Sequence, residues 1–105
     1  MKLIDLIPYL RNSNSLEQLL VEQNLNIDSE AIIICMEESL DIDSEILFFE
    51  IEQTEGNLLF EKNGIKYIEL FPAYHALEIV ESYLPSSDDN QKIANRLLEY
   101  RINDA

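Results

Sequence analysis

The chain has 105 residues, with 7 Lys and Arg against 21 Asp and Glu, which gives a formal net charge of −14. This length fits one domain covering residues 1–105, and a hydrophobic content of 47% is enough for a buried core. The single cysteine excludes a disulfide scaffold, and the single histidine excludes a histidine-based metal cluster.

The apolar segments are too short for a membrane protein. None approaches the roughly 20 apolar residues that span a bilayer, so we expect a cytoplasmic protein with no membrane partner. The negative charge also argues against direct binding to nucleic acid, which requires a positive surface.

The charge is concentrated in one half of the chain. Residues 12–61 contain 13 acidic residues and no Lys or Arg, whereas residues 62–105 contain five bases and seven acids. Those five bases can pair with some of the acids but cannot neutralise them. A one-sided field of this kind is suited to steering a basic partner. The alternative is an acidic surface that only keeps the protein in solution.

Hydrophobic spacing predicts helices in the first part of the chain. Leu3, Ile7 and Leu10, with Leu6 beside them, recur at helical spacing. Ser15 and Gln18 have the spacing of a capping box, which predicts a second helix that ends near Asn24.

Residues 29–40 are compatible with two structures. The run Ala31–Ile34 is typical of a buried strand, whereas Ile32, Met36 and Leu40 fit a helical stripe. We favour a helix because Glu37-Glu38-Ser39 has poor strand propensity.

The middle of the chain predicts three strands. Residues 46–52 are rich in strand-forming residues, and residues 58–60 form a second strand after a turn at 54–57. Asn63-Gly64 then predicts a two-residue type I′ hairpin, since both residues tolerate a positive φ. This turn places three favourable pairs opposite each other across the strands: Glu61 with Lys66, Phe60 with Tyr67 and Leu59 with Ile68.

Two helices follow the strands. Pro72 suits the first turn of a helix that runs to residue 84, and Ser86 and Asp89 open the last one with capping-box spacing. The predicted order is α-α-α-β-β-β-α-α. We therefore expect the α+β class, with a three-stranded antiparallel meander covered by about five helices.

No residue pattern indicates an enzyme. His75 with Glu78 has no accompanying nucleophile, and Cys35 lies in an apolar run without the positive surroundings of a reactive thiolate. The acids from Asp41 to Glu45 alternate like the start of a calcium loop, but Ile46 stands where such a loop needs glycine. We expect no catalytic residue, no metal ligand and no cofactor.

The acids between residues 37 and 55 are dense enough to form the centre of a binding face for a basic protein. The candidate contacts are Glu37, Glu38, Asp41, Asp43, Glu45, Glu52 and Glu55.

A small, strongly acidic chain of helices and a meander without catalytic residues resembles bacterial immunity proteins, in particular those of contact-dependent growth inhibition systems. The resemblance covers the whole chain in size, charge and element order. It rests on the base-free acidic half and on the Asn63-Gly64 hairpin followed by Pro72 and two helices. It implies a cytoplasmic antitoxin that binds one toxin domain, often a nuclease, and blocks its active site or substrate groove.

Three other functions fit the same residues. They are a nucleic-acid mimic that inhibits a DNA-binding protein, a small acidic adaptor or structural subunit, and a metal-dependent enzyme built on Asp41 and Asp43. The oligomeric state does not follow from the sequence.

Overall fold

The computed structural model describes residues 1–25, 32–54, 57–83 and 89–104. Within them, the protein is an α+β fold with helices packed against one antiparallel sheet. In chain order the elements are α1 (Leu3–Leu10), α2 (Ser13–Glu22), β1 (Ile32–Glu37), β2 (Ile46–Glu50), α3 (Ile51–Thr54), β3 (Leu59–Lys62), β4 (Ile65–Pro72), α4 (Ala73–Tyr83) and α5 (Asn90–Asp104). No helix in the described ranges is long and apolar enough to cross a membrane.

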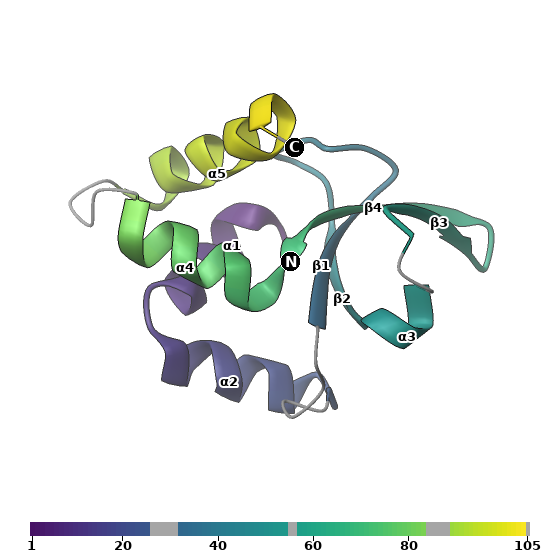
Figure 1. Ribbon diagram of the computed structural model, residues 1–105, viewed down its shortest axis with the longest axis horizontal. Helices are drawn as coiled ribbons and strands as arrows, with labels where there is room; N and C mark the ends of the chain where they lie inside the picture. The colour runs from purple at the N-terminus through teal and green to yellow at the C-terminus, as the bar shows by residue number, and fades with distance from the viewer. Residues whose placement is uncertain (26–31, 55–56, 84–88, 105) are drawn as a thin grey trace.

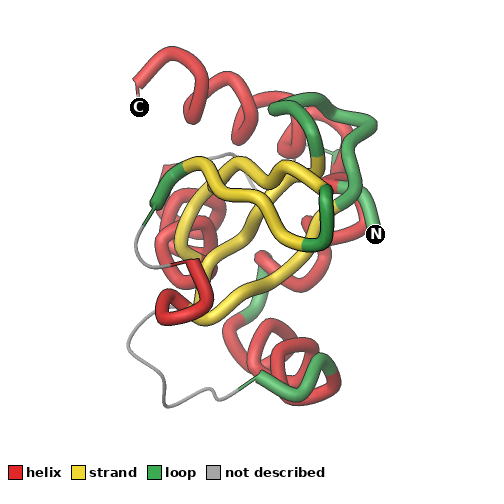
Figure 2. Tube along the Cα trace, turned by 90° about the vertical axis from the view of Figure 1, so that its right-hand side faces the viewer, coloured by secondary structure: helices red, strands yellow, loops and turns green. Residues whose placement is uncertain are grey.

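The helices form one layer and the sheet another. Figure 1 shows α1, α2, α4 and α5 mostly to the left of β1 and β2, with α3 and the β3–β4 hairpin of the sheet to their right. Figure 2, turned by 90°, shows the strands at the centre of the view, with the C-terminal helix α5 above them and other helices behind and below. The main core lies between the two layers and is filled by apolar side chains from α1, α2, α4, α5 and the sheet.

The helix starts are fixed by short polar side chains. Asn12 caps α2, because its side chain accepts hydrogen bonds from the N–H groups of Asn14 and Ser15 at 2.8 and 3.3 Å. The predicted helix start at Ser15 is therefore wrong, because the N-cap is Asn12, about one turn earlier. Asp89 caps α5 by accepting a hydrogen bond from the N–H of Lys92 at 2.8 Å, and Ser86 lies outside the described residues.

The helix predicted for residues 29–40 is wrong, because residues 32–37 form strand β1. This strand occupies the middle of the sheet and is covered on both faces, so its apolar residues are consecutive rather than alternating. Ile32, Ile34 and Met36 face the main core. Ile33 and Cys35 face a second, smaller core on the opposite side of the sheet.

The predicted three-stranded meander is replaced by a four-stranded sheet with the order β2-β1-β4-β3. β1 pairs with β2 on one side, with Ile34 opposite Phe48. It pairs with β4 on the other side, with Met36 opposite Ile68. The predicted strand at 46–52 ends at Glu50, and α3 begins at the next residue, Ile51. β2 and β3, which the meander placed side by side, are the two edges of the sheet.

The hairpin at Asn63-Gly64 is confirmed. The two residues have φ values of 54° and 81°, as a type I′ turn requires. All three predicted cross-strand pairs are present: Glu61 opposite Lys66, Phe60 opposite Tyr67 and Leu59 opposite Ile68. β3 extends to Lys62, two residues beyond the predicted end of that strand.

We expect replacement of Gly64 by alanine to destabilise the fold by about 1–2 kcal/mol. A Cβ at this position meets no atom within 4 Å, so the loss comes from the positive φ and not from a clash. Urea denaturation would measure the change, with Gly64→Asn as the control because asparagine tolerates this conformation better. Equal destabilisation by alanine and asparagine would contradict the backbone explanation.

β3 leaves one side open among the described residues. The N–H of Glu69 donates to the carbonyl of Leu58 at 2.9 Å. Because hydrogen-bonded and non-bonded pairs alternate in an antiparallel ladder, the N–H and C=O groups of Leu59 and Glu61 point away from β4. The side chains of Leu58 and Leu59 are 59% and 61% exposed beside this edge.

The sheet is strongly curled. In a flat sheet β2 and β3 would lie three strand spacings apart, about 14 Å. Instead the rings of Phe49 on β2 and Phe60 on β3 have centroids 5.1 Å apart, and Tyr67 lies 5.1 Å from Phe49. Lys62 covers this cluster, with its Nζ 5.4 Å from the centre of the Phe49 ring. The second core is therefore an aromatic cluster enclosed by the curl.

A bulge in β4 changes the direction of its side chains. Ile34 pairs with Phe71 and Cys35 pairs with Glu69, which leaves Leu70 without an opposite residue on β1. Leu70 and Phe71 both lie in the main core as a result. Glu69 remains on the sheet face that carries Cys35.

Candidate functional site

Five of the seven predicted contact residues lie on the connection between β1 and β2. We call residues 37–45 the acidic loop. Glu37 ends β1 and is half-buried, whereas Glu38, Asp41, Asp43 and Glu45 are exposed. The five acids that are close together in the sequence therefore lie at the end of β1 and on one surface loop.

The acidic loop is held in place by apolar anchors and internal hydrogen bonds. Leu40 and Ile42 are partly buried against the main core, so the alternating Asp41 and Asp43 face outward. The Asp41 carboxylate accepts a hydrogen bond from the N–H of Asp43 at 2.9 Å, and the Ser44 hydroxyl donates to the carbonyl of Ser39 at 2.8 Å. The loop therefore presents its charges from an ordered backbone.

The start of the acidic loop is tied to the sheet. Glu38 has a φ of 70°, a conformation that is strained for a residue other than glycine. Its N–H donates to the carbonyl of Lys66 at 2.8 Å, and the N–H of Glu37 donates to the carbonyl of Glu45 at 3.0 Å. These bonds tie the start of the loop to β4 and close its two ends on each other.

The N-terminus neutralises part of the acidic loop. The Met1 ammonium group lies 2.7 Å from the Glu45 carboxylate, and the Lys2 ammonium lies 4.0 Å from Asp43. The N–H of Ile46 also donates to the carbonyl of Met1 at 2.7 Å. The sequence offered the five bases of residues 62–105 as possible partners for acids of residues 12–61, whereas the salt bridges of the acidic loop within the described ranges involve Met1 and Lys2. No spacing in the sequence indicates this contact.

Of the remaining two predicted contact residues, Glu52 does not join the acidic loop. Glu52 lies on α3, beyond the far end of the five-residue strand β2. At about 3.4 Å per residue, that strand alone separates it from Glu45 by about 17 Å. Glu55 lies outside the described residues.

The side chains considered for catalysis are dispersed. Cys35 is fully buried, and burial raises the pKa of its thiol to about 12, with a further contribution from nearby Glu69. The thiol is therefore protonated at physiological pH and is a weak nucleophile. His75 is exposed on α4, with its ring 5.5 Å from that of Phe71. Among the described residues, no three His, Cys, Asp or Glu side chains are placed to hold a metal ion.

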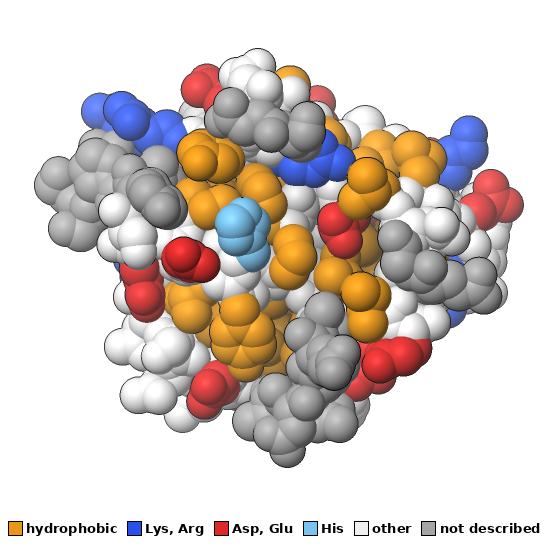
Figure 3. All heavy atoms as spheres, viewed as in Figure 1, with side chains coloured by type: hydrophobic (Ala, Val, Ile, Leu, Met, Phe, Trp, Pro, Cys, Tyr) orange, Lys and Arg blue, Asp and Glu red, His pale blue; other side chains and the backbone are white. Residues whose placement is uncertain are grey.

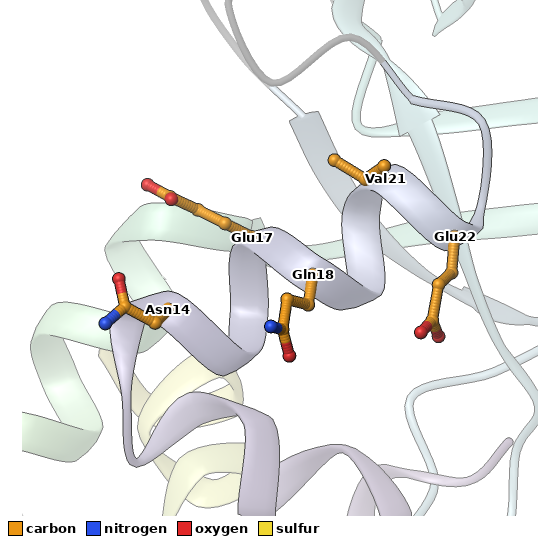
Figure 4. A pocket seen from close by; sticks show the side chains of 5 residues that line it. All are labelled: Asn14, Glu17, Gln18, Val21 and Glu22. Carbon is orange, nitrogen blue, oxygen red and sulfur yellow. The ribbon is translucent and has the colours of Figure 1, made fainter.

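Two hollows were not predicted from the sequence. The larger, about 720 Å³, lies along α2 and is lined by Asn14, Glu17, Gln18, Val21 and Glu22. Figure 4 shows Glu17 and Val21 leaving the helix on the opposite side from Gln18 and Glu22. These side chains line the exposed face of one helix, whose other face is buried in the main core, and they do not converge on a common point.

The smaller hollow, about 460 Å³, combines residues from three parts of the chain. We call it the β4 pocket, and it is lined by Leu58, Glu69, Leu70, Phe71, Pro72 and Arg101. Its lining comes from the segment before β3, from β4 and from the last turn of α5. No sequence motif brings these residues together.

Comparison with protein-family models, with curated proteins and with solved structures gave no match to this chain. Its function is therefore argued from the charge and geometry of the acidic loop and the β4 pocket.

Proposed function

We propose that this protein is a stoichiometric inhibitor of the immunity-protein type, acting in the cytoplasm on a basic toxin domain. The observation that carries the proposal is the acidic loop, an ordered turn with five carboxylates in a 50-residue segment that has no Lys or Arg. A nuclease domain is the partner class we favour, because a groove that binds phosphate is positively charged.

Charge and order support binding in different ways. The net charge of −14 accelerates encounter with a basic surface through long-range attraction. The hydrogen bonds of Asp41 and Ser44 fix the loop before binding, which reduces the conformational entropy lost on association. Fast association and a preformed contact surface are both useful to an inhibitor that must act before its target does.

The acids of the loop are not equivalent. Glu37, Glu38 and Asp41 have no salt bridge within the described part of the chain, whereas Asp43 and Glu45 face Lys2 and Met1. A partner that engages Asp43 or Glu45 must compete with these cations. We therefore place the centre of the interface at Glu38 and Asp41, and we place Glu52 outside it.

The direct test is to co-express this chain with the product of the adjacent gene and to purify the two together. We expect a stable complex in which the activity of the partner is blocked. Its association rate should fall at least about tenfold between about 0.05 M and about 0.5 M NaCl, because salt screens the attraction. A complex that leaves the partner active would support the adaptor function instead. Inhibition of a DNA-binding protein would support the nucleic-acid mimic, and an association rate insensitive to salt would contradict the role of the acidic loop.

A further inference from the structure

The β4 pocket differs from the rest of the acidic surface because apolar side chains surround one carboxylate, that of Glu69, and one guanidinium, that of Arg101. Leu58, Phe71 and Pro72 contribute apolar wall, and Glu69 contributes the carboxylate. Figure 3 shows apolar side chains gathered on the face turned to the viewer, between and around the helices α4 and α5, with few charged groups among them. At about 460 Å³ the pocket is within the size range of sites that bind ligands or side chains.

The position of Glu69 follows from the bulge. Leu70 and Phe71 both turn into the main core, and Glu69 stays on the opposite face beside Leu58. Arg101 donates from Nε to the backbone carbonyl of Glu69 at 3.1 Å, which holds the guanidinium at the pocket. Within the described ranges, the Glu69 carboxylate has no salt bridge, although it is only partly exposed.

The surroundings of Glu69 disfavour its negative charge. Burial raises the pKa of the Glu69 carboxyl, and attraction to Arg101 reduces this shift only in part. A carboxyl group whose pKa is raised by folding stabilises the fold below its unfolded pKa, and this contribution is lost as the pH rises through the folded value. The ionised form of Glu69 is therefore the less favourable one in the fold, and a cation entering the pocket would stabilise it.

We propose that the β4 pocket receives one Lys or Arg side chain of the basic partner. The aliphatic stem would pack on Leu58, Phe71 and Pro72, and the cationic group would donate to the Glu69 carboxylate. This proposal rests on the proposed function and adds a specific contact on β4, beyond the loop that extends from β1.

The chemistry of the pocket selects this occupant. An ionised carboxylate only accepts hydrogen bonds, so the group that enters must be a donor. The guanidinium of Arg101 opposes a second cation at this pocket, but the net charge of −14, which already includes Arg101, favours a cationic donor over a neutral one. Lys and Arg alone combine a cationic end with a long apolar stem that can follow a wall of apolar side chains.

A small probe tests the pocket without the partner. N-acetyl-arginine N-methylamide, titrated into the full chain and followed by ¹H–¹⁵N NMR, should shift the amide signals of Leu58, Glu69, Phe71 and Arg101. Saturation should approach in the millimolar range, up to about 50 mM. N-acetyl-norleucine N-methylamide, which has the stem but no charge, should bind at least about tenfold more weakly.

Two variants separate the carboxylate from the general negative charge. Glu69→Gln should weaken binding of the arginine probe about tenfold or more, because the charge-assisted hydrogen bond is lost. Glu81→Gln removes an exposed acid of α4 and should leave the binding unchanged. The proposal is overturned if the arginine probe shifts no pocket signal, if both probes bind equally, or if Glu69→Gln has no effect.

Failure of the pocket proposal and failure of the proposed function give different experimental outcomes. Failure of the arginine probe, together with an intact complex between the protein and its toxin domain, would refute the pocket and leave the inhibitor function standing. Binding of the probe at Glu69 in a protein that forms no complex would support the pocket chemistry but refute the inhibitor function.

Discussion

Replacing Glu37, Glu38, Asp41 and Asp43 together by lysine should weaken the complex with a basic toxin domain by about 100-fold or more. Removal of one partner from a desolvated ion pair loses roughly 2–5 kcal/mol, and each 1.4 kcal/mol corresponds to a factor of ten in affinity. The association rate should also fall and should lose most of its dependence on salt. Isothermal titration and stopped-flow measurements would give the two quantities.

The lysine variant also alters the loop itself, because Asp41 accepts the hydrogen bond from the N–H of Asp43. A second variant with Glu37→Gln, Glu38→Gln, Asp41→Asn and Asp43→Asn removes the charges and keeps an oxygen acceptor at position 41. It should retain the loop and still lose affinity, though less than the lysine variant does.

Four acids outside the acidic loop provide a control with the same change in net charge. Glu22 on α2, Glu78 and Glu81 on α4 and Glu99 on α5 are all exposed. Their joint replacement by lysine should slow association modestly and leave the dissociation rate unchanged, since distant charges act mainly on encounter. If the control variant loses as much affinity as the loop variant, the acidic loop has no special role.

Ile34→Ala should remove about 2–5 kcal/mol from the free energy of unfolding, a large part of the 5–15 kcal/mol typical of a domain. Ile34 is fully buried in the central strand, where its side chain lies in the main core between Phe48 on β2 and Phe71 on β4. The truncated side chain leaves a cavity that strands on both sides prevent from closing. Urea denaturation monitored by circular dichroism would measure the loss.

Leu59→Ala is the matched control for this loss of a large aliphatic side chain. Leu59 also lies in a strand of the sheet, but it is 61% exposed at the edge. Its replacement should change the free energy of unfolding by less than about 0.5 kcal/mol. A similar change for both variants, or a loss below about 1 kcal/mol for Ile34→Ala, would argue against β1 as the buried centre of the sheet.

The elements predicted correctly from the sequence are those determined by neighbouring residues. Asn63-Gly64 determines the β3–β4 hairpin because a two-residue turn fixes the register of the strands on both sides. Pro72 and the following apolar stripe likewise predict α4, which begins at Ala73.

The arrangement of the sheet was not predictable in this way. The apolar run of residues 32–36 fits a buried strand and a buried helix equally well. Backbone pairing with β2 and β4 makes it a strand. If residues 29–40 are predicted as a helix, a three-stranded meander is the simplest arrangement of the remaining strands. The error in topology therefore follows from the error in one element.

The candidate site likewise has one part that is set by neighbouring residues and one part that joins residues distant in the sequence. The acidic loop is a continuous segment, so its density of carboxylates is visible in the sequence. The β4 pocket joins Leu58 to Glu69 and Arg101, and it depends on a bulge that local propensity does not indicate. The ion pair between Met1 and Glu45 likewise joins residues 44 positions apart.

The open side of β3 has a consequence for handling the protein. The outward backbone groups of Leu59 and Glu61, which have no partner among the described residues, are a template for a strand of a second copy. At neutral pH, repulsion between chains that each carry a net charge of −14 opposes such pairing. This repulsion disappears near the isoelectric point of about 4.1, while the exposed leucines remain. Acidification is therefore the condition under which this edge becomes a nucleus for aggregation, and concentrated solutions are best kept well above that pH.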